Sequence, residues 1–142
     1  MEKIPSFTKN HDKLAVGLHE CGTSNNVTTW DLRFKKPNAG DYLSPQSAHT
    51  IEHILATLLR NSAHKADIVY FGPMGCLTGF YLLTVNMDFS QVFDLLKESF
   101  VLALHIDEIP GSKREECGNY LFHDLDGAKD ECKKYLEILK NL

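Results

Sequence analysis

The sequence predicts an α+β fold, a single domain in which helices pack on an antiparallel sheet. Strand-like segments occur in neighbouring pairs, and helical segments lie between and after these pairs, which is typical of this class. The 142 residues contain no internal repeat, low-complexity tract or linker rich in Gly, Ser and Pro. One domain spanning residues 1–142 is therefore expected, long enough to bury a core of its own.

The first strand pair and the first helix are expected in the N-terminal half. Residues 27–34 alternate between apolar and polar side chains, which predicts a half-buried strand. Residues 13–20 are its expected antiparallel partner, with 21–26 as a polar loop. Ser44 followed by Pro45 is typical of a helix start. This helix should reach about residue 61 and bury a stripe of Ile51, Ile54, Leu55, Leu58 and Leu59.

Two more strands and two more helices are expected in the C-terminal half. Residues 68–71 and 80–86 predict strands, joined through the glycine-rich stretch 72–79. Ser90 is the expected N-cap of a second long helix with a stripe of Val92, Phe93, Leu96, Phe100 and Leu104. A last helix at residues 126–139 should carry Ala128, Cys132, Tyr135, Leu136 and Leu139 on one side.

Charge and composition argue against several classes of protein. The net charge is −4 and the pI is 5.9, without a basic block, so we expect no nucleic-acid partner. No apolar run approaches the length of a membrane span, and the first residues lack the apolar core of a signal peptide. We therefore expect a cytoplasmic protein with no membrane partner. Its four cysteines are then expected to be thiols or metal ligands instead of disulfides.

The run His49-Thr50-Ile51-Glu52-His53 is the strongest chemical signal. On a helix, His49 and His53 share one face and Glu52 stands next to His49. Two histidines four apart can bind one divalent ion, and a carboxylate that is not a ligand can then move protons. The order His-x-x-Glu-His is also found in metallopeptidases. The alternative is that two histidines merely fall four apart on a polar face.

A third ligand is expected from Cys117, which lies outside any predicted helix and precedes Gly118. The alternative is a small buried cysteine without a ligand role. A set of two histidines and one thiolate suits zinc, cobalt or ferrous iron better than magnesium or calcium.

Other candidates carry weaker signals. Cys76 sits between glycines on a predicted turn, where a nearby cation would favour its thiolate, although such a cysteine can simply fill space. Arg33 lies on the strand face opposite Trp30, which would suit a polar pocket or a surface ion pair. Ser6 and His11 are tied to no site by spacing alone.

Five segments in order resemble one enzyme family, S-ribosylhomocysteine lyase or LuxS. They are Ser6-Phe7 with His11, Asp31-Leu32-Arg33-Phe34 with Pro37-Asn38, the run from His49 to His53, the stretch from Gly72 to Tyr81, and Glu116-Cys117-Gly118-Asn119-Tyr120. The resemblance covers nearly the whole chain.

The resemblance implies a cytoplasmic, homodimeric lyase that cleaves S-ribosylhomocysteine to homocysteine and 4,5-dihydroxy-2,3-pentanedione, the autoinducer-2 precursor. The implied chemistry is carbonyl migration by two enolisations, followed by β-elimination of the thiol. One divalent metal per subunit is implied, with Fe(II) expected in the cell and Zn(II) or Co(II) as alternatives. The implied residues are the metal ligands His49, His53 and Cys117, the acid–base residues Glu52 and Cys76, and the substrate-binding residues Ser6, His11, Arg33 and Tyr70.

Two departures from the family pattern leave other functions open. The family motif commonly reads Asp-Ile-Ser-Pro-Met-Gly-Cys-Arg, whereas Tyr70 stands here at the aspartate and Leu77 at the arginine. A divergent or inactive member with an altered substrate is therefore one alternative. A His-x-x-Glu-His metallopeptidase-like domain is another, although Cys76 would have no part in peptide hydrolysis.

Overall fold

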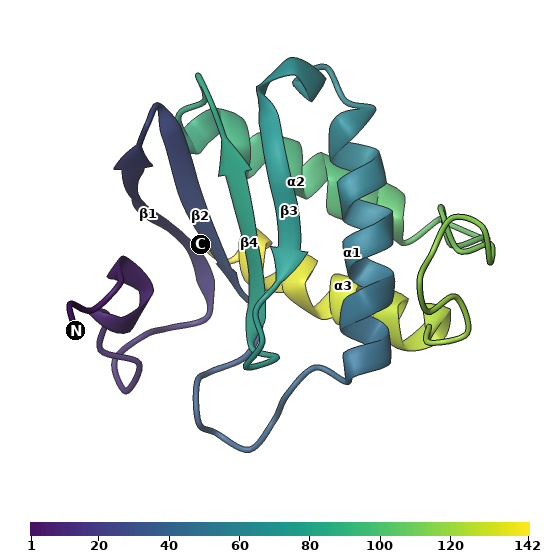
Figure 1. Ribbon diagram of the computed structural model, residues 1–142, viewed down its shortest axis with the longest axis horizontal. Coiled ribbons are helices and arrows are strands. Elements are labelled where there is room, and N and C mark those ends of the chain that lie inside the picture. Colours follow the sequence, from purple (N-terminus) through teal and green to yellow (C-terminus); the bar gives the residue numbers. More distant parts are fainter.

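The computed structural model describes residues 1–142 and shows a four-stranded antiparallel sheet with three helices (Figure 1). The strands are β1 (Gly17–Ser24), β2 (Val27–Arg33), β3 (Ile68–Pro73) and β4 (Gly79–Thr84), in the order β1-β2-β4-β3. The helices are α1 (Pro45–Arg60), α2 (Phe89–Ala103) and α3 (Leu125–Lys140). Short 3-10 helices lie at Pro5–Phe7 and Lys65–Asp67. The predicted α+β class and antiparallel sheet are confirmed.

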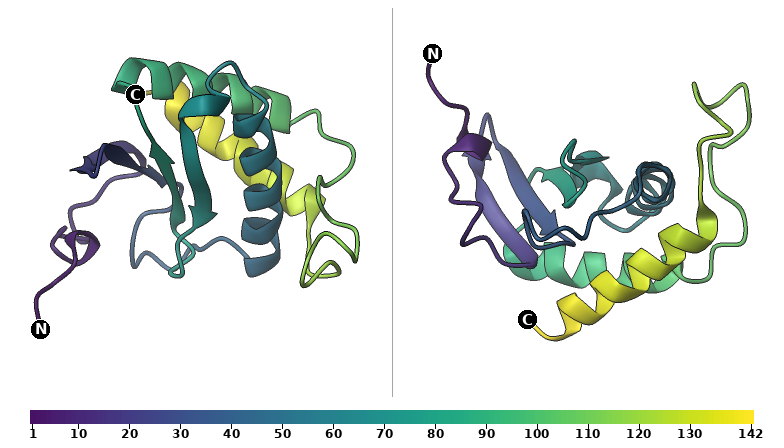
Figure 2. Two further views of the ribbon diagram at one scale, coloured as in Figure 1. Left: turned by 45° about the horizontal axis from the view of Figure 1, so that its top comes forward. Right: turned by 90° about the horizontal axis from the view of Figure 1, so that it is seen from below.

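The helices leave one face of the sheet uncovered. α2 and α3 lie behind the sheet, and α1 flanks it on the side of β3 (Figures 1 and 2). The loop that joins α2 to α3 lies beyond α1, whereas the N-terminal segment lies beside β1 (Figure 2). These two segments are therefore at opposite sides of the molecule. No helix is both long and apolar enough to cross a membrane.

A single cluster of 25 buried residues forms the core between the sheet and the helices. Phe34 stacks on Tyr135 of α3, with ring centroids 4.1 Å apart, and also contacts Phe80 and Phe100. The predicted α3 stripe is entirely buried. In the α1 stripe Leu58 is only partly buried, and the other four residues are fully buried.

Helix α1 begins as predicted. The Ser44 side chain accepts a hydrogen bond from the Ser47 amide, and Pro45 occupies the first turn. The prediction that Ser90 caps α2 is wrong. Asp88 is the cap and forms a reciprocal capping box with Gln91, so the helix starts one residue before Ser90.

The first hairpin differs from its prediction. β1 runs to Ser24, so residues 21–24 belong to a strand and only Asn25 and Asn26 form the turn. Both asparagines have positive φ, 53° and 65°, a conformation that favours two-residue hairpins and that Asn tolerates.

The prediction that the β2 strand is half-buried is also wrong at its C-terminal end. Asp31 and Arg33 are buried although they lie on the face opposite Trp30. The N-terminal segment covers this face in part, because Lys9 reaches Asp31. The ion pair of Arg33 with Asp31 is therefore buried, and the Arg33 side chain is not open to solvent.

Candidate active site

Helix α1 holds His49 and His53 side by side on its half-buried face. Their ring centroids are 4.7 Å apart, as expected for residues one turn apart. The opposite face of α1 is anchored in the core by Ile51, Ile54 and Leu55. The core packing therefore sets the direction in which the two imidazoles project.

The loop between α2 and α3 brings Cys117 to the two histidines. Its Sγ lies 3.6 Å from Nε2 of His49 and 3.9 Å from Nε2 of His53. Cys117 also closes a turn in which its amide donates to the Lys113 carbonyl. The three residues that the sequence singled out as ligands thus lie together.

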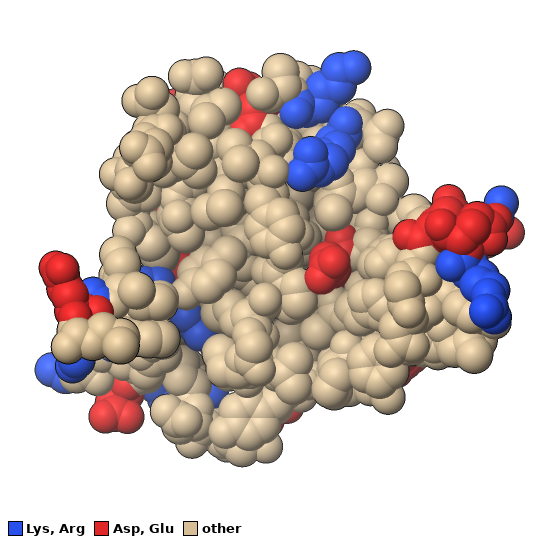
Figure 3. All heavy atoms as spheres, in the orientation of Figure 1, with Lys and Arg blue, Asp and Glu red and all other residues tan.

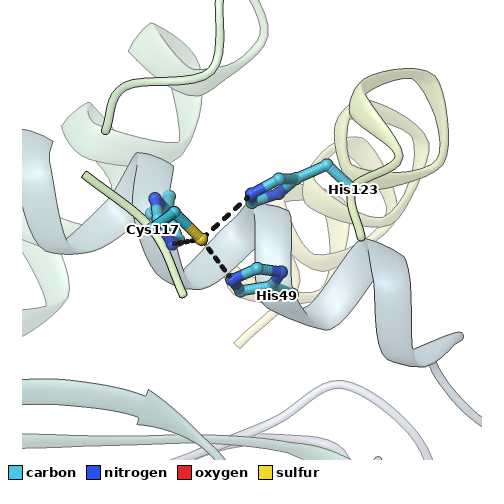
Figure 4. Close-up of side chains that lie close together, drawn as sticks. His49, Cys117 and His123 are labelled. Carbon is cyan, nitrogen blue, oxygen red and sulfur yellow. Dashed lines mark hydrogen bonds between the residues drawn. The ribbon is translucent and has the colours of Figure 1, made fainter. Parts of the chain in front are cut away.

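His123 completes this group and was missed by the sequence reasoning. Its Nε2 lies 3.9 Å from the Cys117 Sγ, and its ring stacks on that of His49 at 4.0 Å (Figure 4). Ligand atoms of His49, His53, Cys117 and His123 all lie within 4.8 Å of one another. The sequence offered one signal that could have identified His123: it follows the candidate ligand Cys117 by six residues and directly precedes Asp124, the N-cap of α3.

Backbone carbonyls orient the two helix histidines. Nδ1 of His49 donates to the Phe122 carbonyl at 2.5 Å, and Nδ1 of His53 donates to the Pro110 carbonyl at 2.9 Å. Because a carbonyl can only accept, the proton of each neutral ring is on Nδ1, and the Nε2 lone pair faces the shared centre. A hydrogen bond from the ring nitrogen that faces away from the ion is typical of metal-binding histidines.

Thr50 orients His123 in the same way. Its hydroxyl donates to the Gln46 carbonyl, accepts from the Asp124 amide and lies 2.9 Å from Nδ1 of His123. Since the single hydroxyl proton goes to Gln46, Nδ1 of His123 is the donor to Thr50. Burial and the neighbouring His49 and His53 lower the pKa of His123 to about 4, so its ring is neutral at neutral pH.

The four side chains could hold one metal ion. The donor set is chemically suitable, because neutral imidazole nitrogens and a thiolate are the ligands of zinc and related ions. The sulfur–nitrogen distances of 3.6–3.9 Å are close to the edge of a tetrahedron around such an ion. Three protein ligands would leave a position for substrate, whereas four would close the site.

Glu52 lies on α1 three residues after His49 and directly before His53, and it is half-buried. Its carboxylate makes no hydrogen bond or ion pair within the chain. A carboxylate without an internal partner can accept and donate protons to a bound molecule.

A second polar group, here called the sheet cluster, consists of Lys9, Asp31, Arg33, Thr78 and Cys76. Arg33 donates to both carboxylate oxygens of Asp31, at 3.1 and 2.5 Å, and to the Thr78 hydroxyl at 2.7 Å. Cys76 is exposed on the β3–β4 turn, and its Sγ lies 3.0 Å from the same hydroxyl. Hydrogen bonds thus connect Cys76 to the buried arginine.

Lys9 forms the other end of the sheet cluster. It lies 3.0 Å from Asp31 and donates to the Cys21 thiol at 2.9 Å. Burial lowers the pKa of Lys9, but the hydrogen bonds to Cys21 and Asp31 outweigh burial and raise the pKa above its usual value. The Lys9 side chain is therefore positively charged at neutral pH.

Ser6 and His11 lie near this end of the sheet cluster. Ser6 lines a cavity of about 390 Å³ together with Lys9, Cys21 and Tyr81. Nδ1 of His11 lies 3.1 Å from the Lys9 carbonyl. No hydrogen bond or ion pair joins the sheet cluster to the histidine centre on α1.

The comparison with known proteins identifies the family. A family model described as S-ribosylhomocysteinase (LuxS) matches residues 4–141. The chain belongs to the LuxS family. The chain is 48% identical to the S-ribosylhomocysteine lyase of Borreliella afzelii over 149 aligned positions, which cover 100% of this chain and 95% of that protein. It is 44% identical to the protein of the same name from Phocaeicola vulgatus (100% and 93% covered) and 42% identical to that from Finegoldia magna (100% and 94% covered).

The two positions of this LuxS-family chain that depart from the expected motif, Tyr70 and Leu77, lie on β3 and on the turn after it. Tyr70 is exposed, and its phenol occupies the place that a Cβ on residue 72 would take, so a side chain there would require the phenol to move. Leu77 has a positive φ of 61°, which is unfavourable for a leucine. Both departures from the family motif therefore lie within a few residues of Cys76.

Proposed function

We propose that this chain is an S-ribosylhomocysteine lyase that releases homocysteine and 4,5-dihydroxy-2,3-pentanedione. The observation that carries the proposal is the convergence of His49, His53 and Cys117 on one centre, with Glu52 on the same helix, in a chain whose LuxS match spans residues 4–141. Relatives of the same name align over their nearly complete length.

His49, His53 and Cys117 are the proposed ligands of one divalent ion per chain. Fe(II) is the ion expected in the cell, and Zn(II) or Co(II) would suit the same donors. When bound, such an ion supplies a Lewis acid that polarises a sugar oxygen of the substrate. His123 is assigned to the rim of this centre, because the reaction needs a position that no protein ligand fills.

Glu52 is the proposed acid–base residue beside the metal ligands. Cleavage of an unactivated thioether first requires a carbonyl β to the carbon that carries sulfur, so carbon-bound protons must be removed and returned. The free, half-buried carboxylate of Glu52 suits proton abstraction from C4 and protonation of the leaving group.

Cys76 is the proposed acid–base residue for the earlier proton transfers. Its exposed position on the β3–β4 turn makes it accessible to substrate, and its contact with Thr78 links it to a cation. All four cysteines of the chain are free thiols, which suits a reducing cytoplasmic compartment.

Ser6, His11, Arg33 and Tyr70 are the proposed substrate-binding residues of a site shared in a homodimer. Arg33 is buried and bonded to Asp31 and Thr78, so substrate would have to take the place of one of these partners. The N-terminal segment with Ser6 and His11 lies beside β1, whereas the loop with Cys117 lies beyond α1 (Figures 1 and 2). One chain would not bring both to the same small substrate, and a second copy could. Figure 3 shows the face of the molecule on which no helix covers the sheet, in the orientation of Figure 1. This face carries few charged side chains, which suits burial against a second copy.

The test is to incubate metal-loaded protein with S-ribosylhomocysteine and follow the free thiol of homocysteine. We expect release by the native sequence and a loss of roughly 10²–10⁴-fold in Glu52→Gln and in Cys76→Ala, both with unchanged metal content. Glu98→Gln, an exposed carboxylate on α2 without an ion pair, is the matched control. Absence of thiol release from the native sequence, or equal release from Cys76→Ala, would contradict the proposal.

The shared site has a separate test. Cys117→Ala and His11→Ala chains should each be inactive, and a mixture allowed to exchange subunits should regain activity. A mixture that stays inactive, although sedimentation shows dimers that exchange, would argue against a site built from two chains.

The departures at Tyr70 and Leu77 favour one second candidate, a family member with an altered substrate. A native protein that loads metal but leaves S-ribosylhomocysteine intact would support this candidate. Cleavage of casein that Glu52→Gln abolishes would instead support a metallopeptidase-like activity.

A further inference from the structure

The N-terminal segment, defined here as residues 1–13, is held to the rest of the chain through one side chain. Its residues are exposed except Ser6, Lys9 and His11, which are half-buried. All of its backbone hydrogen bonds run between residues of the segment itself, and so do the side-chain hydrogen bonds of its other residues. Only the side chain of Lys9 makes hydrogen bonds and an ion pair outside the segment.

Lys9 contacts three strands on the sheet face that no helix covers. Its Nζ lies 3.0 Å from Oδ2 of Asp31 on β2 and 2.9 Å from Sγ of Cys21 on β1. It also lies 5.6 Å from the centroid of the Tyr81 ring on β4. Because the Asp31 side chain is fully buried, water screens its attraction to the ammonium less than it would at the surface. The strongest polar contact of the segment is therefore directed at the middle of the sheet.

Lys9 lies between the two residues of the segment that are proposed to bind substrate. Ser6 and Lys9 line the same cavity of about 390 Å³, and Nδ1 of His11 lies 3.1 Å from the Lys9 carbonyl. Neither Ser6 nor His11 makes a hydrogen bond to the sheet. Their positions relative to the sheet therefore depend on the contacts of Lys9.

Asp31 does not depend on Lys9 in the same way. Arg33 donates to both of its carboxylate oxygens, whether or not the ammonium is present. Loss of the Lys9 charge would leave the buried carboxylate paired, which avoids the large penalty of an unpaired buried charge. We therefore expect removal of this charge to loosen the segment and to leave the sheet folded.

We propose that Lys9 is a positioning residue that anchors the N-terminal segment on the sheet and so fixes Ser6 and His11 for substrate binding. This rests on the proposed function, in which these two residues bind S-ribosylhomocysteine. A segment that is ordered in advance does not take the conformational entropy of its ordering from the binding free energy. Lys9 therefore acts on the affinity for substrate and not on the proton transfers.

The first test measures the order of the segment without the lyase reaction. Nuclear magnetic resonance relaxation of Zn(II)-loaded, isotope-labelled full-length protein gives the order parameter of each backbone amide. In Lys9→Met we expect the order parameters between Ser6 and His11 to fall below about 0.6, the range of flexible backbone. The amides of β2 should keep their native values. Lys9→Gln replaces this variant if the methionine chain does not fold.

Two variants serve as controls. Lys9→Arg keeps a cation that can donate to Asp31, and it should retain the native order parameters. Lys13→Met removes an exposed lysine of the same segment that has no ion pair, and it should change nothing.

The second test separates binding from catalysis. In Lys9→Met we expect KM for S-ribosylhomocysteine to rise about tenfold with kcat unchanged, as for the loss of a hydrogen bond to a charged group that affects binding alone. Lys9→Arg should restore most of the native KM. A purely structural role of Lys9 in the sheet would not produce this pattern.

Unchanged order parameters in both Lys9→Met and Lys9→Gln would overturn the proposal, as would equal loosening in Lys13→Met. Loosening in Lys9→Arg as large as in Lys9→Met would also overturn it, since the charge would then not be the cause. A looser segment with an unchanged KM would contradict the link between Lys9 and substrate binding. A native chain that releases no homocysteine, but shows the expected order parameters, contradicts the proposed function and leaves the anchor at Lys9 intact.

Discussion

His53 donates a hydrogen bond from Nδ1 to the backbone carbonyl of Pro110, 2.9 Å away. This contact ties helix α1 to the start of the loop that carries Cys117. The next residue, Gly111, has a positive φ of 67°, and a Cβ there would lie 3.3 Å from Nδ1 of His53. A side chain at this position would therefore strain the backbone and crowd the His53 ring.

Gly111→Ala should weaken metal binding about tenfold, because it strains the backbone and displaces the carbonyl that orients His53. Competition with a chelating dye measures the affinity. Gly118→Ala in the same loop is the control, since its Cβ would meet no atom within 4 Å. Equal affinities in the two variants would show that the Pro110 contact does not support the metal centre.

His123→Ala should still bind one metal ion per chain, whereas His49→Ala and Cys117→Ala should bind none. The reason is that a lyase centre needs three protein ligands and one position for substrate. Metal analysis after gel filtration gives the stoichiometry, and the visible spectrum of the Co(II) form reports the coordination. Loss of metal from His123→Ala would indicate four protein ligands and would favour a structural site.

Tyr70→Phe should raise KM for S-ribosylhomocysteine about fivefold and leave kcat unchanged, if the phenol hydroxyl contributes one ordinary hydrogen bond to substrate binding. Steady-state kinetics separate the two constants. Tyr42→Phe, another exposed tyrosine, is the control. A native chain without activity that gains it in Tyr70→Asp would instead show that the tyrosine has changed the substrate.

Cys132→Ala should reduce the loss of stability at alkaline pH. Burial raises the pKa of the Cys132 thiol from 9.0 to about 12, so the folded chain keeps a proton that the unfolded chain loses. Stability from this group is complete below pH 9 and is lost as the pH rises towards 12, by at most about 1.4 kcal/mol per unit. Urea titrations at pH 7, 9 and 10.5 test this. Parallel declines of the unfolding free energy in both proteins would contradict it.

Local signals predicted most of the fold. The cap at Ser44, the proline after it and the apolar stripe of α1 act within one segment, so the helix was found nearly to its ends. The errors arose where two local signals compete, or where a residue is buried by a segment that lies far from it in the sequence. Asp88 and Ser90 can both cap a helix, and the reciprocal bond with Gln91 decides for Asp88.

The burial of Asp31 and Arg33 could not be predicted from β2 itself. Alternating side chains indicate two faces, but they do not say that Lys9 and Thr78 will cover the polar one. Residue spacing alone equally gave no connection between Arg33 and Cys76, because the contact runs through Thr78 on the turn between β3 and β4.

The sequence by itself determined the pair His49 and His53 with Glu52 beside it, because one helical turn sets their spacing. Only the tertiary structure decided which distant side chains join them. The Asp124 amide donates to Thr50 at the start of α3, and the Phe122 carbonyl accepts from His49. These long-range bonds close the loop over α1 and carry both Cys117 and His123 to the centre, and no local periodicity encodes where a loop of this length will close.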